Sequence, residues 1–372
     1  MSHTDFEHIR PFNDAEVAET LAKLTAAKDW VSMLSPLIGV DNAEEIAETM
    51  PFIETISEFQ DDLTFPFLEA LIEGTTSGVT VSFDSNNLDE FFSKPLLHLT
   101  NHRDIILDPS LVNVARMGNG FPSTEVGIGD NLLSRSWVED LVRINRCFVV
   151  PRGGSARDKW ASSLLVASYI RHAISNEKSV WLAQKEGRAK DGKDLTSPAL
   201  IRMLTSEGGE ESWDNLNVCP VSLSYEWDPC DAFKVRELLV TERDGAYVKA
   251  EGEDEASMAL GLTGSKGRVH LHFCKKVEWK TEEGERDERV VASLVDKAIY
   301  GGYHVYPNQV LSAKHLGIDV KVEVEISDAD IEAFNTRLDD VVSFVGGGFS
   351  KEEIENKWCE ITVQPLLSKL NG

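Results

Sequence analysis

The sequence lacks any long apolar run. A helix that spans a bilayer needs ~20 consecutive apolar residues, and no stretch of the 372 residues approaches that length. The opening residues, MSHTDFEHIRPFNDAE, carry no basic start followed by an apolar segment, so we expect no secretory signal. We therefore expect a cytoplasmic protein, either dissolved or peripheral on the inner face of the membrane.

Positive charge is also scarce, with 37 Lys and Arg against 63 Asp and Glu and a net charge of −26. Nucleic acids are bound through summed Lys and Arg charge, so this balance argues against a nucleic-acid partner. The shortage is uneven, because residues 131–205 hold 13 Lys and Arg against 7 Asp and Glu. The net charge of this basic stretch is therefore +6, and that of the rest of the chain is −32. Anionic ligands are expected there.

Cysteine is sparse as well: the five cysteines are odd in number and scattered. They provide no disulfide framework and are expected to be reduced core residues of a cytoplasmic protein. An apolar share of 42% predicts a globular chain with a buried core.

Three regions are predicted along the chain: a helical N-terminal region at 1–75, an α/β core at 76–249, and a C-terminal extension at 250–372 that packs on or continues the core. In the core, short β-type runs alternate with helix-length segments, which predicts an α/β fold with a largely parallel twisted sheet and helices on both faces. The predicted strands are Val79–Phe83, Leu96–Leu99, Glu125–Ile128, Cys147–Val150, Val180–Ala183 and Val218–Tyr225. The predicted helices are Ser110–Arg116, Trp137–Asn145, Ala156–Ser175 and Ser197–Thr205.

The C-terminal extension opens on an acidic, glycine-containing stretch, 250–267, which is predicted to be a surface loop or linker. Apolar residues alternate with charged ones at 320–326 and predict a half-buried strand, followed by a helix with Ser327 as its cap.

Three residues of types that bind metals share one face of a further predicted strand: His270, His272 and Cys274. The sequence offers no evident fourth ligand, so we interpret them as packing residues and expect no metal.

The most informative segment is LLHLTNHRDIILDPSLV, residues 96–112, in which an apolar run opens into His102 and reaches Asp108. An imidazole titrates near neutrality and a carboxylate fixes its tautomer, so the two together can deprotonate a hydroxyl. Asp108 also suits a helix N-cap ahead of Pro109. Asp104 is kept as the reserve partner, and a satisfied loop histidine without function is the alternative.

Arg152 follows a predicted strand and precedes two glycines in RINRCFVVPRGGSARDK. A guanidinium there can pair bidentately with phosphate oxygens. The alternative is a surface arginine paired with Asp158 or Glu139.

Another predicted strand runs into Lys185, Glu186, Gly187 and Arg188 in SVWLAQKEGRAKDG. Glycine permits a tight turn, while Lys185 and Arg188 can face an acidic headgroup. The alternative is a charged turn without function.

These three segments, followed by the proline-led strand NVCPVSLSYEWDP, occur in the order seen in the glycerolipid acyltransferase superfamily, which the chain resembles. That superfamily includes lysophosphatidate and glycerol-3-phosphate acyltransferases. The sequence departs from its pattern in three places. The interval from His102 to Asp108 is one residue longer, Gln184 and Lys185 stand where the family has Phe-Pro, and Arg188 follows Gly187 directly.

The resemblance implies transfer of a fatty acyl group to a hydroxyl of a glycerol phosphate in phospholipid biosynthesis. The donor would be acyl-CoA or acyl-ACP, and the acceptor glycerol-3-phosphate or a lysophospholipid such as lysophosphatidate. His102 would act as general base with Asp108 as its partner, without an acyl-enzyme, while the substrate-binding residues would be Arg152, Lys185, Glu186, Gly187 and Arg188. No cofactor is implied, and the partners would be acyl carrier protein and a peripheral membrane surface. The alternatives are a lyso-aminolipid acceptor, or a catalytically silent homologue that binds lipid or acyl carrier protein.

Overall fold

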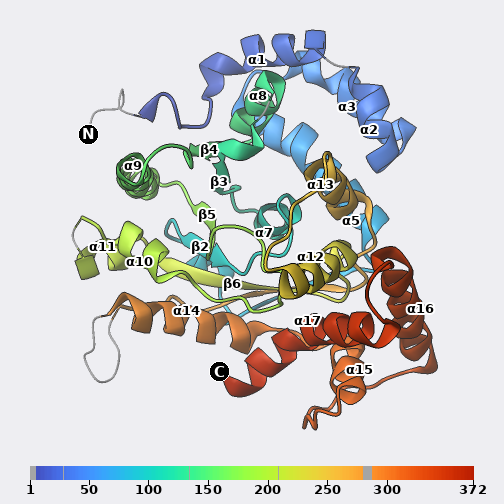
Figure 1. Ribbon diagram of the computed structural model, residues 1–372. Helices are drawn as coiled ribbons and strands as arrows, with labels where there is room; N and C mark the ends of the chain where they lie inside the picture. The colour runs from blue at the N-terminus through green and yellow to red at the C-terminus, as the bar shows by residue number, and fades with distance from the viewer. Residues whose placement is uncertain (1–5, 28, 134, 208, 280–286) are drawn as a thin grey trace.

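The computed structural model describes residues 6–27, 29–133, 135–207, 209–279 and 287–372, and a seven-stranded sheet lies at its centre (Figure 1). The strands are β1 (Val79–Phe83), β2 (Leu97–Thr100), β3 (Glu125–Gly129), β4 (Cys147–Val150), β5 (Val180–Ala183), β6 (Val218–Tyr225) and β7 (Val269–Phe273). Their order is β1-β7-β6-β2-β5-β3-β4, and the β6–β7 pairing is antiparallel while the other pairings are parallel. β1 and β7 therefore run opposite to the five other strands.

Helices of the N-terminal region cover one face of the sheet. They are α1 (Asp14–Ala27), α2 (Trp30–Ile38), α3 (Val40–Thr49), η2 (Met50–Phe52), α4 (Ile56–Glu58), η3 (Phe59–Thr64) and α5 (Phe65–Thr75). Their apolar side chains share one core with sheet residues such as Trp181 and Leu223. Two helices that connect strands, α7 (Leu107–Met117) and α8 (Ser136–Ile144), cover the same face. Two short helices, α6 (Leu88–Phe91) and η4 (Asp130–Leu132), precede β2 and α8 in the chain.

The other face packs against α9 (Ala156–Ser175), α10 (Pro198–Leu204), α11 (Gly209–Asn215) and α14 (Glu288–Gly302). Because both faces are covered, central strands such as β2 and β6 are almost wholly buried, including their polar residues His98, Ser222 and Ser224. The predicted fold class is thus confirmed. The bounds of β1, β4, β5 and β6 match the predictions, β2 is shifted by one residue at each end, and β3 is one residue longer at its C-terminal end.

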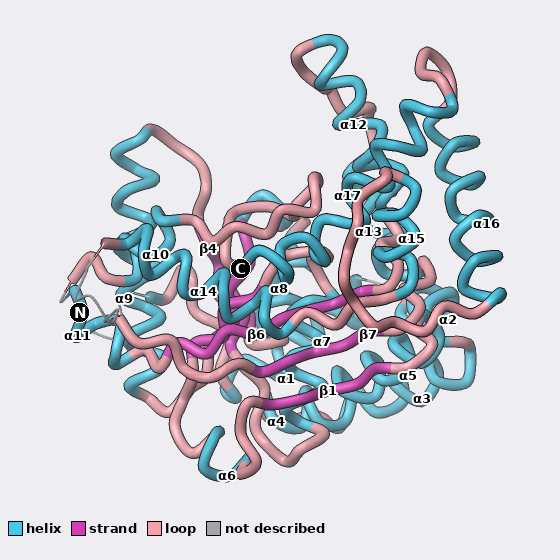
Figure 2. Tube along the Cα trace, turned by 90° about the horizontal axis from the view of Figure 1, so that it is seen from below, coloured by secondary structure: helices cyan, strands magenta, loops and turns pink. Residues whose placement is uncertain are grey.

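The C-terminal helices form a second layer beside the sheet (Figure 2). α15 (Pro307–His315), α16 (Asp328–Val345) and α17 (Lys351–Asn371) pack with α12 (Asp231–Asp244) around a small core that includes Trp358. Ser327 caps α16 by accepting a hydrogen bond from the backbone N–H of Asp330, as predicted. β7 lies beyond residue 249 and belongs to the central sheet, while the domain boundary there stays a prediction.

Two predictions for the extension are wrong. Residues 250–267 contain a helix, α13 (Glu253–Thr263), whose Leu262 packs against the N-terminal core. Residues 320–326 are not a strand. Their alternation reflects one-sided burial, since Val320 and Val322 pack near Leu366 of α17, but a strand also needs a hydrogen-bonded neighbour and this segment lies against helices.

Within the described residues, no helix combines the length and apolar character that crossing a membrane requires. All five cysteines are described, and none forms a disulfide.

Candidate functional site

His102 lies in the turn between β2 and α7, at the carboxyl edge of the five strands that run parallel to one another, β6, β2, β5, β3 and β4. Its Nδ1 is 2.8 Å from Oδ2 of Asp108, whose side chain is completely buried. A carboxylate only accepts hydrogen bonds, so Nδ1 carries the proton and Nε2 presents a lone pair. The imidazole keeps 11% of its surface exposed. A histidine held in this tautomer can take a proton from a bound hydroxyl.

Asp104 serves the helix instead of the histidine. Its Oδ1 accepts the N–H groups of Ile106 (2.9 Å) and Leu107 (2.8 Å), so it caps α7. The expectation that Asp108 caps a helix starting at Pro109 is wrong, because the helix begins at Leu107 and Asp108 lies in its first turn. From there Asp108 turns back to His102, and the additional residue is accommodated in the loop.

The Asp108 carboxylate is held from several sides. Oδ2 also accepts the N–H groups of Arg103 (2.7 Å) and Asp104 (3.0 Å), and Oδ1 accepts the hydroxyl of Tyr225 (2.8 Å). Burial and the neighbouring Asp108 charge raise the pKa of Tyr225 well above its ordinary value, so the phenol stays protonated and donates. These bonds fix the carboxylate against rotation.

Sequence reasoning missed Tyr225 and Asn101. Asn101 donates to the carbonyl of Leu223 (2.9 Å) and accepts its N–H (2.8 Å), which anchors the start of the His102 turn to β6. The available signal was position, because Tyr225 ends a predicted strand and active groups gather at the carboxyl ends of parallel strands. Which strand neighbours β2 was not visible in the sequence.

Tyr225→Phe is expected to lower kcat about tenfold, because a hydrogen bond to a charged group contributes ~1.5–3 kcal/mol. The variant would also lose thermal stability. Tyr169→Phe is the matched control, since Tyr169 donates to Glu125 (2.6 Å) on α9's side of the sheet, away from His102. It should lose comparable stability and keep kcat. Equal kcat in the two variants would show that Tyr225 only supports the fold.

The predicted phosphate ligand Arg152 is engaged by another predicted site residue. Its Nη1 lies 2.7 Å from Oε1 of Glu186, and its backbone N–H donates to Asp130 (3.2 Å). The alternative partners of Arg152 are wrong. Asp158 bonds instead to Ser155, the N-cap residue of α9, and Glu139 pairs with Arg143. The Arg152 side chain is 35% exposed and that of Glu186 78% exposed, so the pair is accessible to a ligand.

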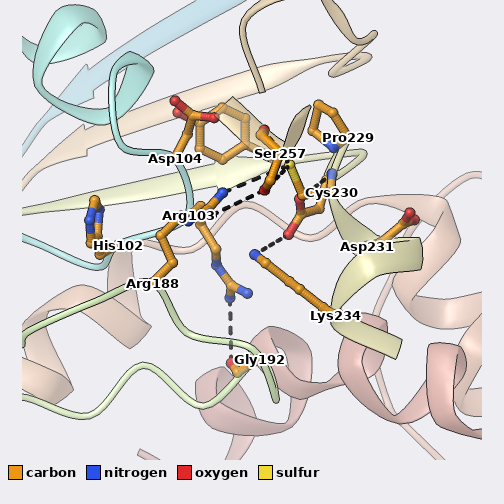
Figure 3. Close-up of polar contacts among 12 residues, drawn as sticks. His102, Arg103, Asp104, Arg188, Gly192, Pro229, Cys230, Asp231, Lys234 and Ser257 are labelled. Atoms are coloured by element: carbon orange, nitrogen blue, oxygen red, sulfur yellow. Dashed lines mark hydrogen bonds and ion pairs between the residues drawn. The ribbon is translucent and has the colours of Figure 1, made fainter. Parts of the chain in front are cut away.

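Arg188 points toward α13 and the start of α12 instead (Figure 3). Its Nη2 donates to Ser257 Oγ (3.2 Å) and its Nη1 contacts the Cys230 sulfur (3.8 Å). Lys185 donates to the carbonyl of Lys193 (3.2 Å). Gly187 has φ +74°, a backbone conformation that glycine adopts without strain. The chain turns at this glycine, between Glu186, which bonds to Arg152, and Arg188, which bonds to Ser257. Arg152 and Arg188, which the resemblance implied would hold one phosphate, thus bond to different partners in this structure.

The loop that carries Arg188 nevertheless adjoins His102. The N–H of Ala189 donates to the His102 carbonyl (3.0 Å). The ring centroids of Trp181 and His102 are 6.1 Å apart in an edge-to-face arrangement. The turns after β2 and β5 are therefore one connected rim.

A cavity of about 60 Å³ adjoins the His–Asp pair, lined by Asp104, Tyr225 and Lys266 among others. Burial, and then the charge of Asp108, raises the pKa of Asp104. Burial lowers the pKa of Lys266 to about 8. Its ammonium donates to the carbonyl of Leu262 (2.7 Å). Neither His102 nor Asp108 is among the residues that line this cavity.

No grouping of three or more His, Cys, Asp or Glu side chains suited to a metal ion occurs in the part of the chain that the structure describes. His270 and His272 bond instead to hydroxyl groups of β1.

No family model matches the chain. No curated protein matches it either. Among solved structures, the 1-acyl-sn-glycerophosphate (LPA) acyltransferase PlsC from Thermotoga maritima is similar, with 10% identity, 83% of this chain and 98% of that chain covered, and a TM-score of 0.37. The signal recognition particle receptor FtsY from Elizabethkingia anophelis in complex with GDP has 12% identity, coverage of 78% and 92%, and a TM-score of 0.22. Both TM-scores lie below 0.5, so neither similarity shows a shared activity.

Chemically, the site offers an imidazole with a buried, fully bonded carboxylate behind it and an arginine–glutamate pair on a neighbouring turn of the same sheet edge. Such a set can remove a proton from a hydroxyl and bind an anionic group on the same molecule.

Proposed function

We propose that the chain is a glycerolipid O-acyltransferase that moves a fatty acyl group from a thioester to a hydroxyl of a glycerol phosphate. The observation that carries the proposal is the 2.8 Å bond between His102 and the buried Asp108, which prepares Nε2 to accept a proton. The four sequence blocks that resemble the superfamily supply the substrate classes: acyl-CoA or acyl-ACP as donor, and glycerol-3-phosphate or lysophosphatidate as acceptor.

In the proposed reaction, His102 Nε2 takes the acceptor hydroxyl proton as the oxygen attacks the thioester carbonyl. The C–S bond then breaks, and the leaving thiolate takes the proton back from the imidazolium. Asp108 stabilises the imidazolium between the two transfers. Direct attack is proposed because the nearby Cys230 and Ser257 contact Arg188 and each other rather than His102. The reaction needs no cofactor beyond the acyl donor.

The proposed acceptor site is the turn after β5 together with Arg152. Glu186 pairs with one amino group of the Arg152 fork and orients it, so the second amino group can bind a phosphate oxygen. Gly187 lets the turn bend, and Lys185 adds positive charge near the exposed rim. Arg188 would reach a phosphate only by exchanging its contacts with Ser257 and Cys230.

Kinetics on arginine variants test this assignment. Arg152→Ala should raise the Michaelis constant for a phosphate-bearing acceptor about tenfold or more, because charge-assisted bonds worth ~1.5–3 kcal/mol are lost. Arg152→Lys should recover only part of the loss, since an ammonium lacks the bidentate fork. Arg188→Ala should have the smaller effect on the acceptor, because Arg188 is already engaged.

The matched control is Arg171→Ala, which removes a comparable surface pair with Glu207 (2.6 Å) and should leave both constants unchanged. If only the donor constant moves in Arg152→Ala, this arginine belongs to the donor site and the proposed orientation of the substrates is reversed.

The proposed macromolecular partners are acyl carrier protein and the surface of the membrane that holds lipid acceptors and products. Both carry negative charge, and the basic stretch at 131–205 supplies the turns after β4 and β5, which carry Arg152 and Lys185.

The experiment that tests the function is an acyl-transfer assay on the purified chain. It crosses acyl-CoA and acyl-ACP with glycerol-3-phosphate, lysophosphatidate and a lyso-aminolipid. Transfer to a glycerol phosphate supports the proposal, and transfer only to the zwitterionic acceptor would reassign the acceptor. If binding of acyl donor occurs without transfer in every combination, the chain is a silent binding homologue.

A further inference from the structure

Two rows of polar side chains cross the outer three strands on the face that α14 covers. The register aligns Thr80, His270 and Ser224 in one row, and Ser82, His272 and Ser222 in the other. On the opposite face the same strands place Val81, Leu271 and Leu223 against the N-terminal core. These rows lie outside the His102 site.

The Ser82 hydroxyl lies between two imidazoles. Its Oγ is 2.8 Å from Nδ1 of His272 and 2.9 Å from Nε2 of His270. The other nitrogen of His272 is 3.2 Å from Oδ1 of Asp84, and the other nitrogen of His270 is 2.8 Å from Oγ1 of Thr80. All five groups thus form one chain of hydrogen bonds.

Proton counting gives this chain a single direction. Asp84 accepts, so His272 in its neutral form carries the proton on Nε2 and accepts at Nδ1 from the Ser82 hydroxyl. A hydroxyl has one proton, so His270 then donates to Ser82 through Nε2. Its Nδ1 faces the Thr80 hydroxyl at 2.8 Å, and that hydroxyl also lies 3.4 Å from the Val269 carbonyl. Burial, followed by the charge of His304, lowers the pKa of His270 to about 4, which keeps this imidazole neutral at neutral pH. Ser82 is therefore polarised from both sides.

The surroundings leave Ser82 within reach of solvent. β1 is the edge strand, Ser82 is half-buried, and the side chains of His272 and Asp84 are 20% and 38% exposed. Gly302 at the end of α14 lies against His272 so closely that a Cβ there would be 2.8 Å from its ring. The backbone of α14 thereby holds the imidazole from behind, and β1 is the outermost strand of the sheet on that side.

We propose that Ser82 is a nucleophile activated by His272 and Asp84, forming a second reactive site that accepts acyl or phosphonyl groups from activated esters. The arrangement is that of a serine, a base that takes its proton, and a carboxylate that orients the base. His270 donates to the same oxygen and stabilises the negative charge that develops as the proton leaves. This activity is independent of His102.

With an ester, the Ser82 oxygen forms a bond to the acyl carbon as its proton passes to His272 Nδ1. The ester C–O bond breaks, and the leaving alkoxide or phenoxide takes that proton. Water then attacks the acyl-serine, loses its proton to His272, and the carboxylic acid departs as Ser82 regains its hydrogen. With a fluorophosphonate, a P–O bond forms, fluoride leaves with the proton, and the adduct persists.

The test is labelling of the full chain with a fluorophosphonate, read by intact mass and by peptide mapping. One adduct per chain on Ser82 is expected. His272→Gln and Asp84→Asn should each slow labelling about 10²-fold or more, as expected for loss of general-base help. His102→Ala should be labelled like the wild type.

Ser85→Ala is the control for serine replacement on this edge, because Ser85 bonds only locally, to the Asn87 backbone (3.1 Å), and labelling should persist. Mapping on the wild-type chain needs no variant to fold. A wild-type chain without an adduct on Ser82, or one labelled at an unchanged rate after His272→Gln, would overturn the proposal.

Discussion

His102→Ala is expected to abolish measurable acyl transfer, with a loss of about 10²–10⁴-fold in kcat, the range that general-base help contributes. The reason is that Nε2 is the proton acceptor in the proposed reaction, and the turn holds it in the correct tautomer. The fold should persist, because His102 lies in a loop and its backbone carbonyl still accepts from Ala189 in the variant. The measurement is steady-state transfer with the best donor and acceptor pair.

His315→Ala is the matched control, since His315 is an exposed histidine at the end of α15 and should keep full activity. Circular dichroism and thermal unfolding on both variants separate lost chemistry from lost structure. Wild-type turnover by folded His102→Ala would remove this residue from the mechanism, together with the proposed function's main support.

Asp108→Asn is expected to have the next largest effect, a fall in kcat of about 10²-fold or more. An amide oxygen can still accept the Nδ1 proton, so the imidazole keeps its position, but the charge that stabilises the imidazolium is gone. Asp104→Asn, the comparison variant, should change kcat only a few-fold, because asparagine caps a helix about as well as aspartate.

The two substituted residues are four positions apart, and each variant replaces one carboxylate oxygen by an amide nitrogen. The comparison therefore shows which of the two carboxylates supports the reaction of His102. A larger loss of kcat in Asp104→Asn, at equal thermal stability, would assign the partner role to Asp104. It would mean that the turn rearranges when substrate binds, because Asp104 is engaged with Ile106 and Leu107 here.

Local sequence carried the prediction of the His–Asp pair because its geometry is local. His102 and Asp108 are six residues apart, and a strand end, a turn and the first helical turn bring them together. The starts of α9 and α16 are also decided by local sequence, because their capping boxes at Ser155 and Ser327 involve residues only three positions apart. Alternation failed at 320–326, where one-sided burial on helices produces the pattern of a strand.

The residues that hold the catalytic pair come from far along the chain. Tyr225 is 117 positions from Asp108, and Asn101 meets β6 at a separation of 122. These contacts depend on β6 lying beside β2, a choice among many strand orders that hydrophobic patterns do not distinguish.

The sequence by itself determined the α/β class, the strand segments and the candidate base with its carboxylate, because each depends on residues within one or two turns of chain. Only the tertiary structure decided that Arg152 pairs with Glu186 while Arg188 turns toward Ser257. It also decided that β7 runs antiparallel to β6, which sets Ser82 against His272. Side-chain partners across strands are fixed by register and strand order, and these arise from packing of the whole chain.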